Sequence, residues 1–317
     1  MPSTPPVLVS VDWGTTALRC ALVGQDGGII ERRDGGPGIM QIQAAEFSAV
    51  LESETGDWRR TYGPLPVLMS GMVGSRQGWV EAPYLSCPAT VRQLADALLA
   101  VTTPLFGHVY LVPGLAIDDG KAPDVMRGEE TQIFGACEAT GRWGDELFVL
   151  PGTHSKWVTT RAGAITSFAT YMTGEVFSAV RNHSILGRLM ASDGNGRDAS
   201  AFERGIGDGA GPGHPGDLLH RLFATRTLGL FDKVAANGLE DYLSGLLVGA
   251  ELGAATAGGP LGQHGSFVAI GSANLCDRYL HAARVLGLEA TAAPSDCAAQ
   301  GHLTLAKAAG LLKDIQS

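Results

Sequence analysis

The chain has 317 residues, of which 45% are hydrophobic and 17% charged, so it can bury an apolar core for about two domains and is not a disordered chain. Its 44 glycines are about twice the usual share, which indicates a folded protein rich in turns and loops. With 23 basic and 32 acidic residues the net charge is −9, which argues against non-specific binding to nucleic acid.

The spacing of the cysteines and the composition of the N-terminus indicate a cytoplasmic protein with no membrane partner. The five cysteines are odd in number and form no C-x-x-C pair, which argues against a disulfide framework and a cysteine zinc site. The N-terminus lacks a basic segment followed by an apolar one, and no run approaches 18 apolar residues. The eight histidines form no H-E-x-x-H pair, so a metal held wholly by protein ligands is not expected.

The first half of the chain opens with strands. Apolar, β-branched runs predict a hairpin, and the polar turn Asp12-Trp13-Gly14-Thr15-Thr16 lies at its tip. The expected strands cover 7–11, 18–23, 28–32, 66–69 and 109–113, and the expected helices cover 44–60, 91–101 and 128–140.

A second cycle of strand, Gly-Thr turn and strand begins near residue 147 and suggests two repeated halves with a cleft between them. A doubly wound dinucleotide-binding sheet is the competing architecture, but G-x-G-x-x-G is absent after the first strand. The glycine-rich segment 192–215 is expected to be a loop. The other expected strands cover 147–150, 157–160 and 267–270, and the expected helices cover 174–190, 218–225, 239–257, 274–286 and 298–315.

The two Gly-Thr turns, one in each half, are candidate phosphate-binding segments. Backbone N–H groups beside a glycine can approach a phosphate, and a carboxylate at a strand end can hold Mg²⁺ through water. Either turn alone is equally typical of a plain tight turn. The candidate nucleotide-binding residues are Gly14, Thr15, Thr16 and Arg19 in the first half and Gly152, Thr153, His154 and Lys156 in the second.

Glu129 and Glu130 follow Arg127 at the start of a predicted helix. A kinase needs a carboxylate that accepts the proton of the attacking hydroxyl, and a helix start holds such a group rigidly. Acidic residues are also common in first helical turns because they offset the helix dipole. The pattern alone therefore leaves a catalytic role open.

Two further segments are candidates for binding a ligand. The loop after the strand at 66–69 is rich in glycine and carries Arg76 and Trp79, which suit a carboxylate and a sugar respectively, although a plain connection is equally possible. The turn Gly271-Ser272-Ala273-Asn274 joins a strand to a helix, where small residues let a ribose or a flat ring approach the backbone. Close packing of strand and helix is the alternative there.

Taken together, these motifs resemble the 2-dehydro-3-deoxygalactonokinase family. The similarity extends in order along nearly the whole chain. It rests on Asp12 to Thr16 with Arg19, Ser70 to Ser75 with Gly78-Trp79 and Ala82-Pro83-Tyr84, Val125 to Gln132, Pro151 to Trp157, Met172 to Glu175, Asn182 to Ser184, Tyr242 to Leu247 and Ile270 to Ser272.

The resemblance implies an α/β fold with two ribonuclease H-like domains of the actin and sugar kinase type and an interdomain cleft that binds ATP. The expected N-terminal domain covers 1–142, completed by the terminal helix 298–317, and the C-terminal domain covers 143–297. Gly271, Ser272 and Asn274 fall in the adenosine motif, where Ser272 replaces a second glycine found in related kinases.

The reaction implied by the resemblance is transfer of the ATP γ-phosphoryl group, with Mg²⁺, to the terminal hydroxyl of 2-dehydro-3-deoxy-D-galactonate. By the same resemblance the base is Glu129 or Glu130, with Glu129 preferred, and Asp12 holds Mg²⁺ indirectly. The candidate sugar-acid residues are Ser70, Gly71, Arg76, Trp79, Tyr84, Arg127 and Glu175, with Arg76 or Arg127 on the carboxylate.

Two alternatives stay open on the sequence. A kinase for another 2-keto-3-deoxy sugar acid would share every phosphate motif, and a sugar-sensing protein of the same fold would bind without turnover. The preferred epimer and the oligomeric state are also open, with a homodimer as one option. The expected partners are a sugar acid and ATP.

Overall fold

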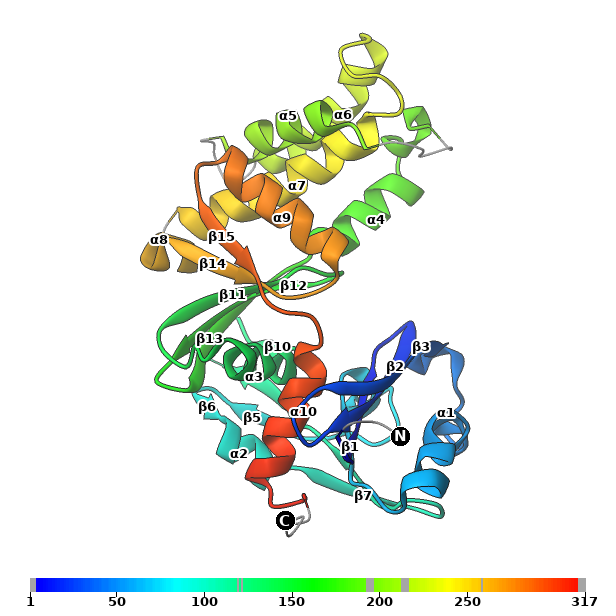
Figure 1. The fold of residues 1–317 in the computed structure, drawn as a ribbon. Helices are drawn as coiled ribbons and strands as arrows, with labels where there is room; N and C mark the ends of the chain where they lie inside the picture. Colours follow the sequence, from blue (N-terminus) through cyan, green and yellow to red (C-terminus); the bar gives the residue numbers. More distant parts are fainter. Residues whose placement is uncertain are drawn as a thin grey trace. The chain divides into compact units, whose positions relative to one another are not determined.

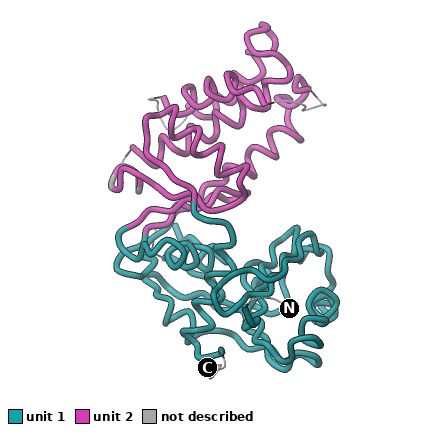
Figure 2. The backbone as a smooth tube through the Cα atoms, in the orientation of Figure 1, with its two compact units in different colours: residues 1–145, 160–168, 293–317 teal, residues 146–159, 169–292 magenta. Residues whose placement is uncertain are grey.

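The computed structural model describes residues 4–118, 120, 122–191, 197–211, 217–257 and 259–312. The chain forms two compact units (Figure 2). Unit 1 contains residues 1–145, 160–168 and 293–317, and unit 2 contains residues 146–159 and 169–292. The functional domain boundaries expected from the sequence, at 142/143 and 297/298, stay a prediction.

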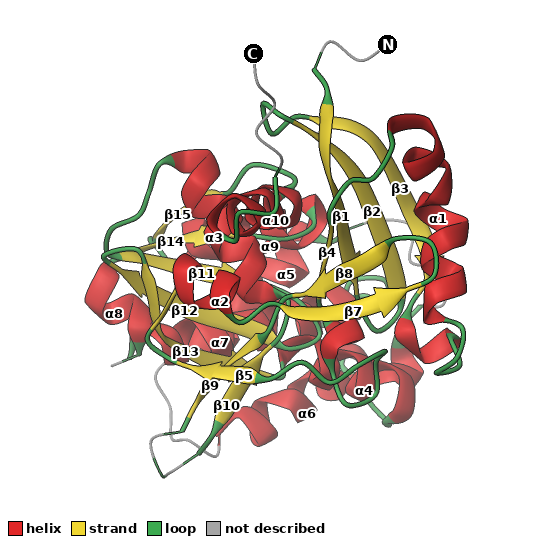
Figure 3. Ribbon diagram, turned by 90° about the horizontal axis from the view of Figure 1, so that it is seen from below, coloured by secondary structure: helices red, strands yellow, loops and turns green. Residues whose placement is uncertain are grey.

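Unit 1 is built on a six-stranded sheet of order β3-β2-β1-β4-β8-β7. The central strand β1 pairs antiparallel with β2 and parallel with β4. Helix α1 lies against this sheet (Figure 3), and its Phe47, Leu51 and Trp58 are buried in the same core as the strand residues. The elements are β1 (Pro6–Trp13), β2 (Ala17–Gly24), β3 (Ile29–Pro37), η1 (Ile39–Gln41), α1 (Phe47–Tyr62), β4 (Val67–Ser70), η2 (Met72–Gly74), β7 (Leu99–Thr103) and β8 (Gly107–Leu111).

A second six-stranded sheet has the order β15-β14-β11-β12-β13-β6. Without the edge strand β6 and read in the opposite direction, this sheet has the order β13-β12-β11-β14-β15. The first sheet has the matching order β3-β2-β1-β4-β8. The chain therefore repeats one α/β topology, as the two strand, turn and strand cycles predict. The strands are β6 (Ala89–Thr90), β11 (Glu146–Leu150), β12 (Ser155–Arg161), β13 (Ala164–Tyr171), β14 (Ser266–Ala269) and β15 (Glu289–Ala292).

Unit 1 also contains a small three-stranded sheet and a close pair of helices. A Cβ atom on Gly135 or Gly301 would come within 3.0 Å of the backbone of the facing helix, so these glycines let α3 and α10 touch. The elements are β5 (Tyr84–Ser86), α2 (Val91–Asp96), β9 (Gly114–Ile117), β10 (Asp124–Met126), α3 (Glu129–Thr140) and α10 (Cys297–Ala308).

The helices of unit 2 include one that the sequence-based prediction missed (Figure 1). Residues 199–210 were expected to be loop because of their glycines, and they form α5 instead. The Asp198 side chain caps this helix by accepting from the Ala201 N–H at 2.9 Å. The helices are α4 (Thr173–His183), η3 (Gly187–Leu189), α5 (Ala199–Ala210), α6 (Asp217–Leu230), α7 (Leu239–Thr256), α8 (Pro260–His264) and α9 (Ala273–Val285).

The glycines of α5 have a packing role. A Cβ on Gly205 or Gly209 would come within 3.0 Å of the α7 backbone, and a Cβ on Gly245 or Gly249 would meet the α5 backbone equally closely. The two helices therefore pack with their backbones in contact. This contact between glycine surfaces outweighs the low helix propensity of the segment.

Replacing one of these contact glycines is expected to destabilise the fold. Gly245→Ala should lower the free energy of unfolding by about 1–3 kcal/mol, because its methyl group has no room beside the Phe202 carbonyl. Urea denaturation measures the change. Gly207→Ala on α5 is the matched control, since a Cβ there meets nothing within 4 Å and the change should be neutral or stabilising. Equal effects of the two substitutions would refute the close contact.

Three other helices are shorter than the sequence predicts. The expected helix 91–101 ends at Asp96, and β-branched residues from Val101 onward belong to β7, which pairs with β8. The expected helix 174–190 ends at His183, where the chain turns back so that Gly187 packs on the Arg181 carbonyl. The terminal helix ends at Ala308 instead of 315, and residues 313–317 lie outside the described residues.

Two further observations concern the whole described chain. No helix in the described residues is long and apolar enough to span a bilayer. All five cysteines are free thiols, and four of them are buried.

Candidate active site

Three segments of unit 1 meet where the parallel strands β1 and β4 end. Asp12 and Ser70 are register partners at these ends. Gly71 has a φ of 92°, and a Cβ there would lie 2.9 Å from the Trp13 carbonyl oxygen. Gly128 has a φ of 107°, and its Cβ would lie 2.9 Å from the Gly71 Cα. Glycine is thus required at both positions, and it brings the start of α3 to the carboxyl ends of the strands, where α/β folds bind ligands.

Asp12 and Arg19 form an ion pair beside this junction, with Arg19 Nη1 donating to Asp12 Oδ2 at 3.2 Å. Burial raises the pKa of the Asp12 carboxyl, and the Arg19 guanidinium opposes that rise. Thr15 and Thr16 are exposed at the tip of the turn, which the Gly14 N–H closes by donating to the Ala17 carbonyl at 2.9 Å. The structure therefore leaves the threonine side chains accessible to a ligand.

Arg127 is a buried cation whose charge has no acidic partner among the described residues. Its exposure is 8%, and its Nε and Nη1 atoms are buried without a hydrogen-bond partner. Only Nη2 is bound, donating to the Ala82 carbonyl at 2.8 Å, and Tyr84 stacks on the guanidinium with 4.2 Å between Cζ and the ring centroid. The Ser70 hydroxyl is also buried without a partner. Such groups are costly unless an anion or another polar ligand completes them.

Glu129 and Glu130 begin α3, as the sequence predicts, but they lie in different surroundings. Glu130 is fully buried, and its carboxylate accepts from the Gly128 N–H at 2.7 and 2.9 Å and from the Thr131 hydroxyl at 3.1 Å. Glu129 is partly exposed and accepts from the Arg127 N–H at 2.9 Å. Glu129 is therefore the more accessible carboxylate, whereas Glu130 is enclosed and braces the turn.

Burial of Glu130 predicts a pH effect on stability. Desolvation, reinforced by the Glu129 charge, raises the pKa of Glu130 from 4.5 to about 8. The folded state then holds more protons than the unfolded state between these values, so this residue makes stability fall as pH rises from about 4.5 to about 8. Thermal denaturation of the wild type and Glu130→Gln measures it. The wild type should lose Tm relative to Glu130→Gln across this range, and parallel profiles would contradict the prediction.

The other sugar-acid candidates of unit 1 differ in accessibility. The Arg76 side chain is 87% exposed and lies 3.5 Å from Glu81, so its charge is solvated and partly paired. Trp79 is half-buried and stacks on Phe47 with 6.0 Å between ring centroids, which makes it part of the core. Tyr84 is exposed on one side and holds Arg127 on the other. The structure brings Ser70, Gly71 and Arg127 together and leaves Arg76 outside the group.

In unit 2 the second Gly-Thr turn is fixed to the start of α4. The Glu175 N–H donates to the Thr153 carbonyl at 2.9 Å, and a Cβ on Gly174 would clash with the Gly152 backbone. His154 pairs with the Glu175 carboxylate. Glu175, predicted on the sugar side, is thus bound to the turn predicted to contact phosphate.

Lys156 does not extend from this turn. Its exposure is 6%, and Nζ donates to the Thr170 hydroxyl at 2.6 Å. Residue 156 already lies within β12 and its side chain is covered, so the expected phosphate contact of Lys156 stays a prediction. The groups that the turn exposes belong to Thr153 and His154, with Gly152 half-buried.

A cavity of about 820 Å³ opens beside this turn, within unit 2. Gly152 lies at one side and Asn274 at another, and Asn274 accepts a hydrogen bond from Arg197. Gly271 adopts a φ of 154° just before α9, a backbone conformation that favours glycine. Ser272 is the N-cap residue of α9, and its side chain makes no cap bond. The cavity is lined by Pro151, Gly152, Thr173, Gly174, Phe177, Arg181, Arg197, Asn237, Glu240, Asp241, Ser244, Leu247, Val248, Asn274, Leu275, Arg278 and Tyr279.

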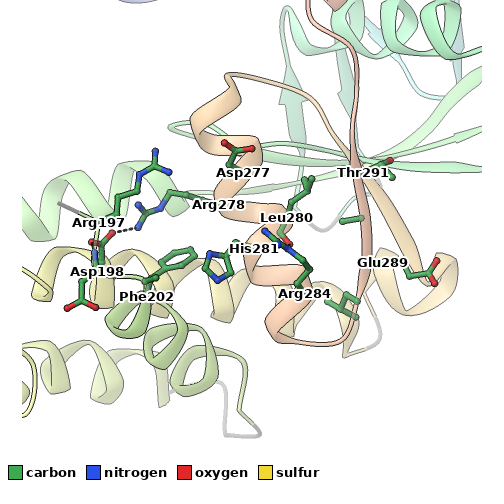
Figure 4. A pocket seen from close by; sticks show the side chains of 14 residues that line it. Arg197, Asp198, Phe202, Asp277, Arg278, Leu280, His281, Arg284, Glu289 and Thr291 are labelled. Atoms are coloured by element: carbon green, nitrogen blue, oxygen red, sulfur yellow. Dashed lines mark hydrogen bonds and ion pairs between the residues drawn. The ribbon is translucent and has the colours of Figure 1, made fainter.

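A second cavity of unit 2, of about 690 Å³, lies along α9 and β15 (Figure 4). Arg197, Asp241 and Arg278 line both cavities. Arg278 donates to Asp241 at 2.8 Å and stacks on Phe202, and His281 pairs with Glu203. The basic groups here are mostly satisfied, unlike Arg127, so this cavity carries no comparable demand for a ligand.

Comparison with known proteins agrees with the motifs. A family model described as 2-keto-3-deoxy-galactonokinase matches residues 12–305. The 2-dehydro-3-deoxygalactonokinase of Escherichia coli strain K12 is 34% identical over 297 residues, which are 93% of this chain and 95% of the relative. The chain belongs to the 2-keto-3-deoxy-galactonokinase family. The resemblance seen in the sequence is thereby confirmed.

Solved structures support the same family and its fold. A crystal structure described as a 2-dehydro-3-deoxygalactonokinase protein from Sinorhizobium meliloti shares 34% identity and a TM-score of 0.84, covering 95% of this chain and 98% of its own. A dehydratase activator from Clostridium difficile with bound ADPNP has a TM-score of 0.52 at 12% identity, covering 98% and 99%, and shows the fold alone. The predicted α/β fold is confirmed.

Membership in the galactonokinase family implies use of ATP, whereas a metal requires separate consideration. The described residues contain no group of three or more His, Cys, Asp or Glu able to hold an ion. The half-buried carboxylate of Asp12 lies at the junction, near the end of β1. This fits Mg²⁺, which takes most of its ligands from water and phosphate.

One residue that the family motifs did not point to is Glu251. It is 3% exposed in α7, and four donors surround its carboxylate. The sequence does carry a signal, because Glu251 is the only charged residue between Ser244 and Thr256. A lone carboxylate within an apolar helix indicates a buried polar network.

Proposed function

We propose that this protein transfers the γ-phosphoryl group of ATP to the terminal hydroxyl of 2-dehydro-3-deoxy-D-galactonate, in the cytoplasm. Family membership supports the reaction class. The observation that carries the proposal is the buried, unpaired Arg127 beside Glu129, at the carboxyl ends of β1 and β4. A cation for the acid group and a base for the hydroxyl are the two groups that this substrate requires.

Arg127 would bind the substrate carboxylate. A buried guanidinium without a carboxylate partner among the described residues is expensive, so charge-assisted hydrogen bonds from Nε or Nη1 to a substrate carboxylate would recover much of that cost. Tyr84 holds the guanidinium plane and Ala82 holds Nη2, which leaves the other two nitrogens oriented for a ligand. Ser70 would donate its free hydroxyl to a substrate oxygen.

Glu129 would accept the proton of the terminal hydroxyl while the oxygen attacks the γ-phosphorus. The new O–P bond forms as the bond to the β,γ-bridging oxygen breaks, and ADP leaves with that electron pair. The Arg127 N–H fixes one Glu129 oxygen at 2.9 Å, so base and carboxylate-binding residue are adjacent on one rigid turn. Positioning supplies most of the rate enhancement in this chemistry.

The nucleotide would use Gly14, Thr15, Thr16 and Arg19 of the first turn and Gly152, Thr153 and His154 of the second. The 820 Å³ cavity of unit 2, which Asn274 lines, would receive the nucleoside, and Gly271 and Ser272 precede Asn274 at the start of α9. Asp12 would hold Mg²⁺ through water, and Lys156 would support β12 from within. When bound, Mg²⁺ would neutralise phosphate charge.

A coupled ADP-release assay over a panel of sugar acids tests this function. We expect turnover with 2-dehydro-3-deoxy-D-galactonate, and the panel includes its C4 epimer because the sequence leaves the preferred epimer open. Preference for another 2-keto-3-deoxy acid would correct the substrate but keep the kinase. ATP binding without phosphorylation of any acid would overturn the kinase and leave a sugar-sensing protein.

A further inference from the structure

We propose that Glu251 is the positioning residue of the nucleotide site: its carboxylate ties the second phosphate turn, the start of α4 and helix α9 into one frame. The inference rests on the proposed nucleotide role of unit 2. Glu251 itself lies on α7 and does not line the 820 Å³ cavity. It therefore acts through the residues that do.

Each oxygen of Glu251 accepts two hydrogen bonds. Oε1 accepts from the Ser155 hydroxyl at 2.8 Å and from Trp157 Nε1 at 2.8 Å. Oε2 accepts from the Tyr279 hydroxyl at 2.8 Å and from the Thr173 hydroxyl. An ionised carboxylate offers acceptors only, which matches this set of four donors without a competing proton.

The donors come from the segments that frame the proposed nucleotide cavity. Ser155 directly follows the turn Gly152 to His154 and opens β12. Thr173 is the first residue of α4, and Tyr279 lies in α9 behind the adenosine motif. Thr173 and Tyr279 both line the cavity. Movement of any one segment would break a bond to the same carboxylate, so Glu251 couples their positions.

The network also explains why this carboxylate is retained in an apolar helix. A buried charge is stabilising only when hydrogen bonds satisfy it, and here all four acceptor positions are filled. Replacing one donor leaves an oxygen partly unsatisfied, whereas removing the carboxylate leaves four buried donors to find other partners. The expected loss is in the geometry of the nucleotide site.

Tyr279→Phe and Tyr242→Phe form a matched pair that tests the proposal. Both tyrosines are buried in unit 2, and each donates its hydroxyl to a carboxylate at 2.8 Å, Tyr279 to Glu251 and Tyr242 to Asp208. Tyr242 does not line the 820 Å³ cavity. Tyr279→Phe should weaken AMP-PNP binding, measured by isothermal titration calorimetry, about three- to tenfold, while Tyr242→Phe changes it less than twofold.

Substitutions of Glu251 separate positioning from folding. Glu251→Ala should weaken AMP-PNP binding on the order of 10- to 100-fold and raise the KM for ATP while the sugar-acid KM changes less than twofold. Glu251→Gln should restore binding to within about fivefold of the wild type, because its amide oxygen can accept from Ser155 and Trp157 and its NH₂ can donate to the two other hydroxyls. Circular dichroism checks that each variant is folded.

The outcomes are decisive in either direction. Equal AMP-PNP affinities of the two tyrosine variants overturn the proposal, even if Glu251→Ala does not fold. A rise in both substrate KM values with no loss of nucleotide affinity also overturns it. If the wild type binds AMP-PNP but phosphorylates no sugar acid, the kinase function fails while the positioning role is still measured by the binding titrations.

Discussion

Glu129→Gln is expected to lower kcat by about 10²- to 10⁴-fold, because it removes the group that accepts the proton of the attacking hydroxyl. The side chain is partly exposed at the start of α3 and can reach a substrate, and its amide replacement keeps the shape. Affinity for AMP-PNP should stay within about twofold, since no step of nucleotide binding uses this carboxylate. Steady-state kinetics and calorimetry measure the two quantities.

Two neighbouring carboxylates provide the comparison. Glu138→Gln changes an exposed residue in the last turn of α3 and should leave kcat unchanged. Glu130→Gln changes the fully buried partner and should retain much more activity than Glu129→Gln. An inactive Glu130→Gln beside an active Glu129→Gln would assign the base to Glu130 instead.

Arg127→Met is expected to raise the KM for the sugar acid on the order of 10²-fold or more, with the KM for ATP nearly unchanged. The substitution removes a buried cation that no carboxylate among the described residues balances, so the lost interaction is with the substrate acid group. Arg127→Lys should recover little, because an ammonium is a compact charge without the rigid, planar set of donors that a guanidinium offers.

Arg76→Met is the matched control, because Arg76 is exposed and lies beside Glu81. It should change the sugar-acid KM less than about threefold. A substrate analogue with a primary alcohol in place of the carboxylate sharpens the comparison: the wild type should discriminate against it strongly, and Arg127→Met should not. Loss of sugar-acid affinity in Arg76→Met but not in Arg127→Met would place the carboxylate at the loop.

The repeated α/β topology was visible in the sequence because it depends on local signals. Apolar β-branched runs, each followed by a Gly-Thr turn, predict both hairpins, and those hairpins are the β1-β2 and β11-β12 pairs. The start of α3 at Glu129 follows equally from its acidic first turn. Signals of this kind depend on a few neighbouring residues, so they can be recognised without knowing which distant residues the segment contacts.

Features that depend on distant partners were not predictable in this way. The glycines of α5 predict a loop, because the α7 residues that they contact are some 40 positions away in the chain. The turn that precedes Lys156 predicts a phosphate ligand at this position, and the sequence does not show that the side chain is buried against Thr170. The sequence favours neither Arg76 nor Arg127 as the carboxylate ligand, and only the difference in their burial distinguishes them. The role of Glu251 likewise depends on four donors that lie far from it in the chain.

The most direct test of the account is the identity of the product formed from ATP and 2-dehydro-3-deoxy-D-galactonate. ³¹P NMR of the reaction mixture should show one new phosphomonoester, coupled to the protons of the terminal carbon and equal in amount to the ADP formed. Inorganic phosphate in place of that signal, or a phosphoryl group on another carbon, would contradict the proposed reaction.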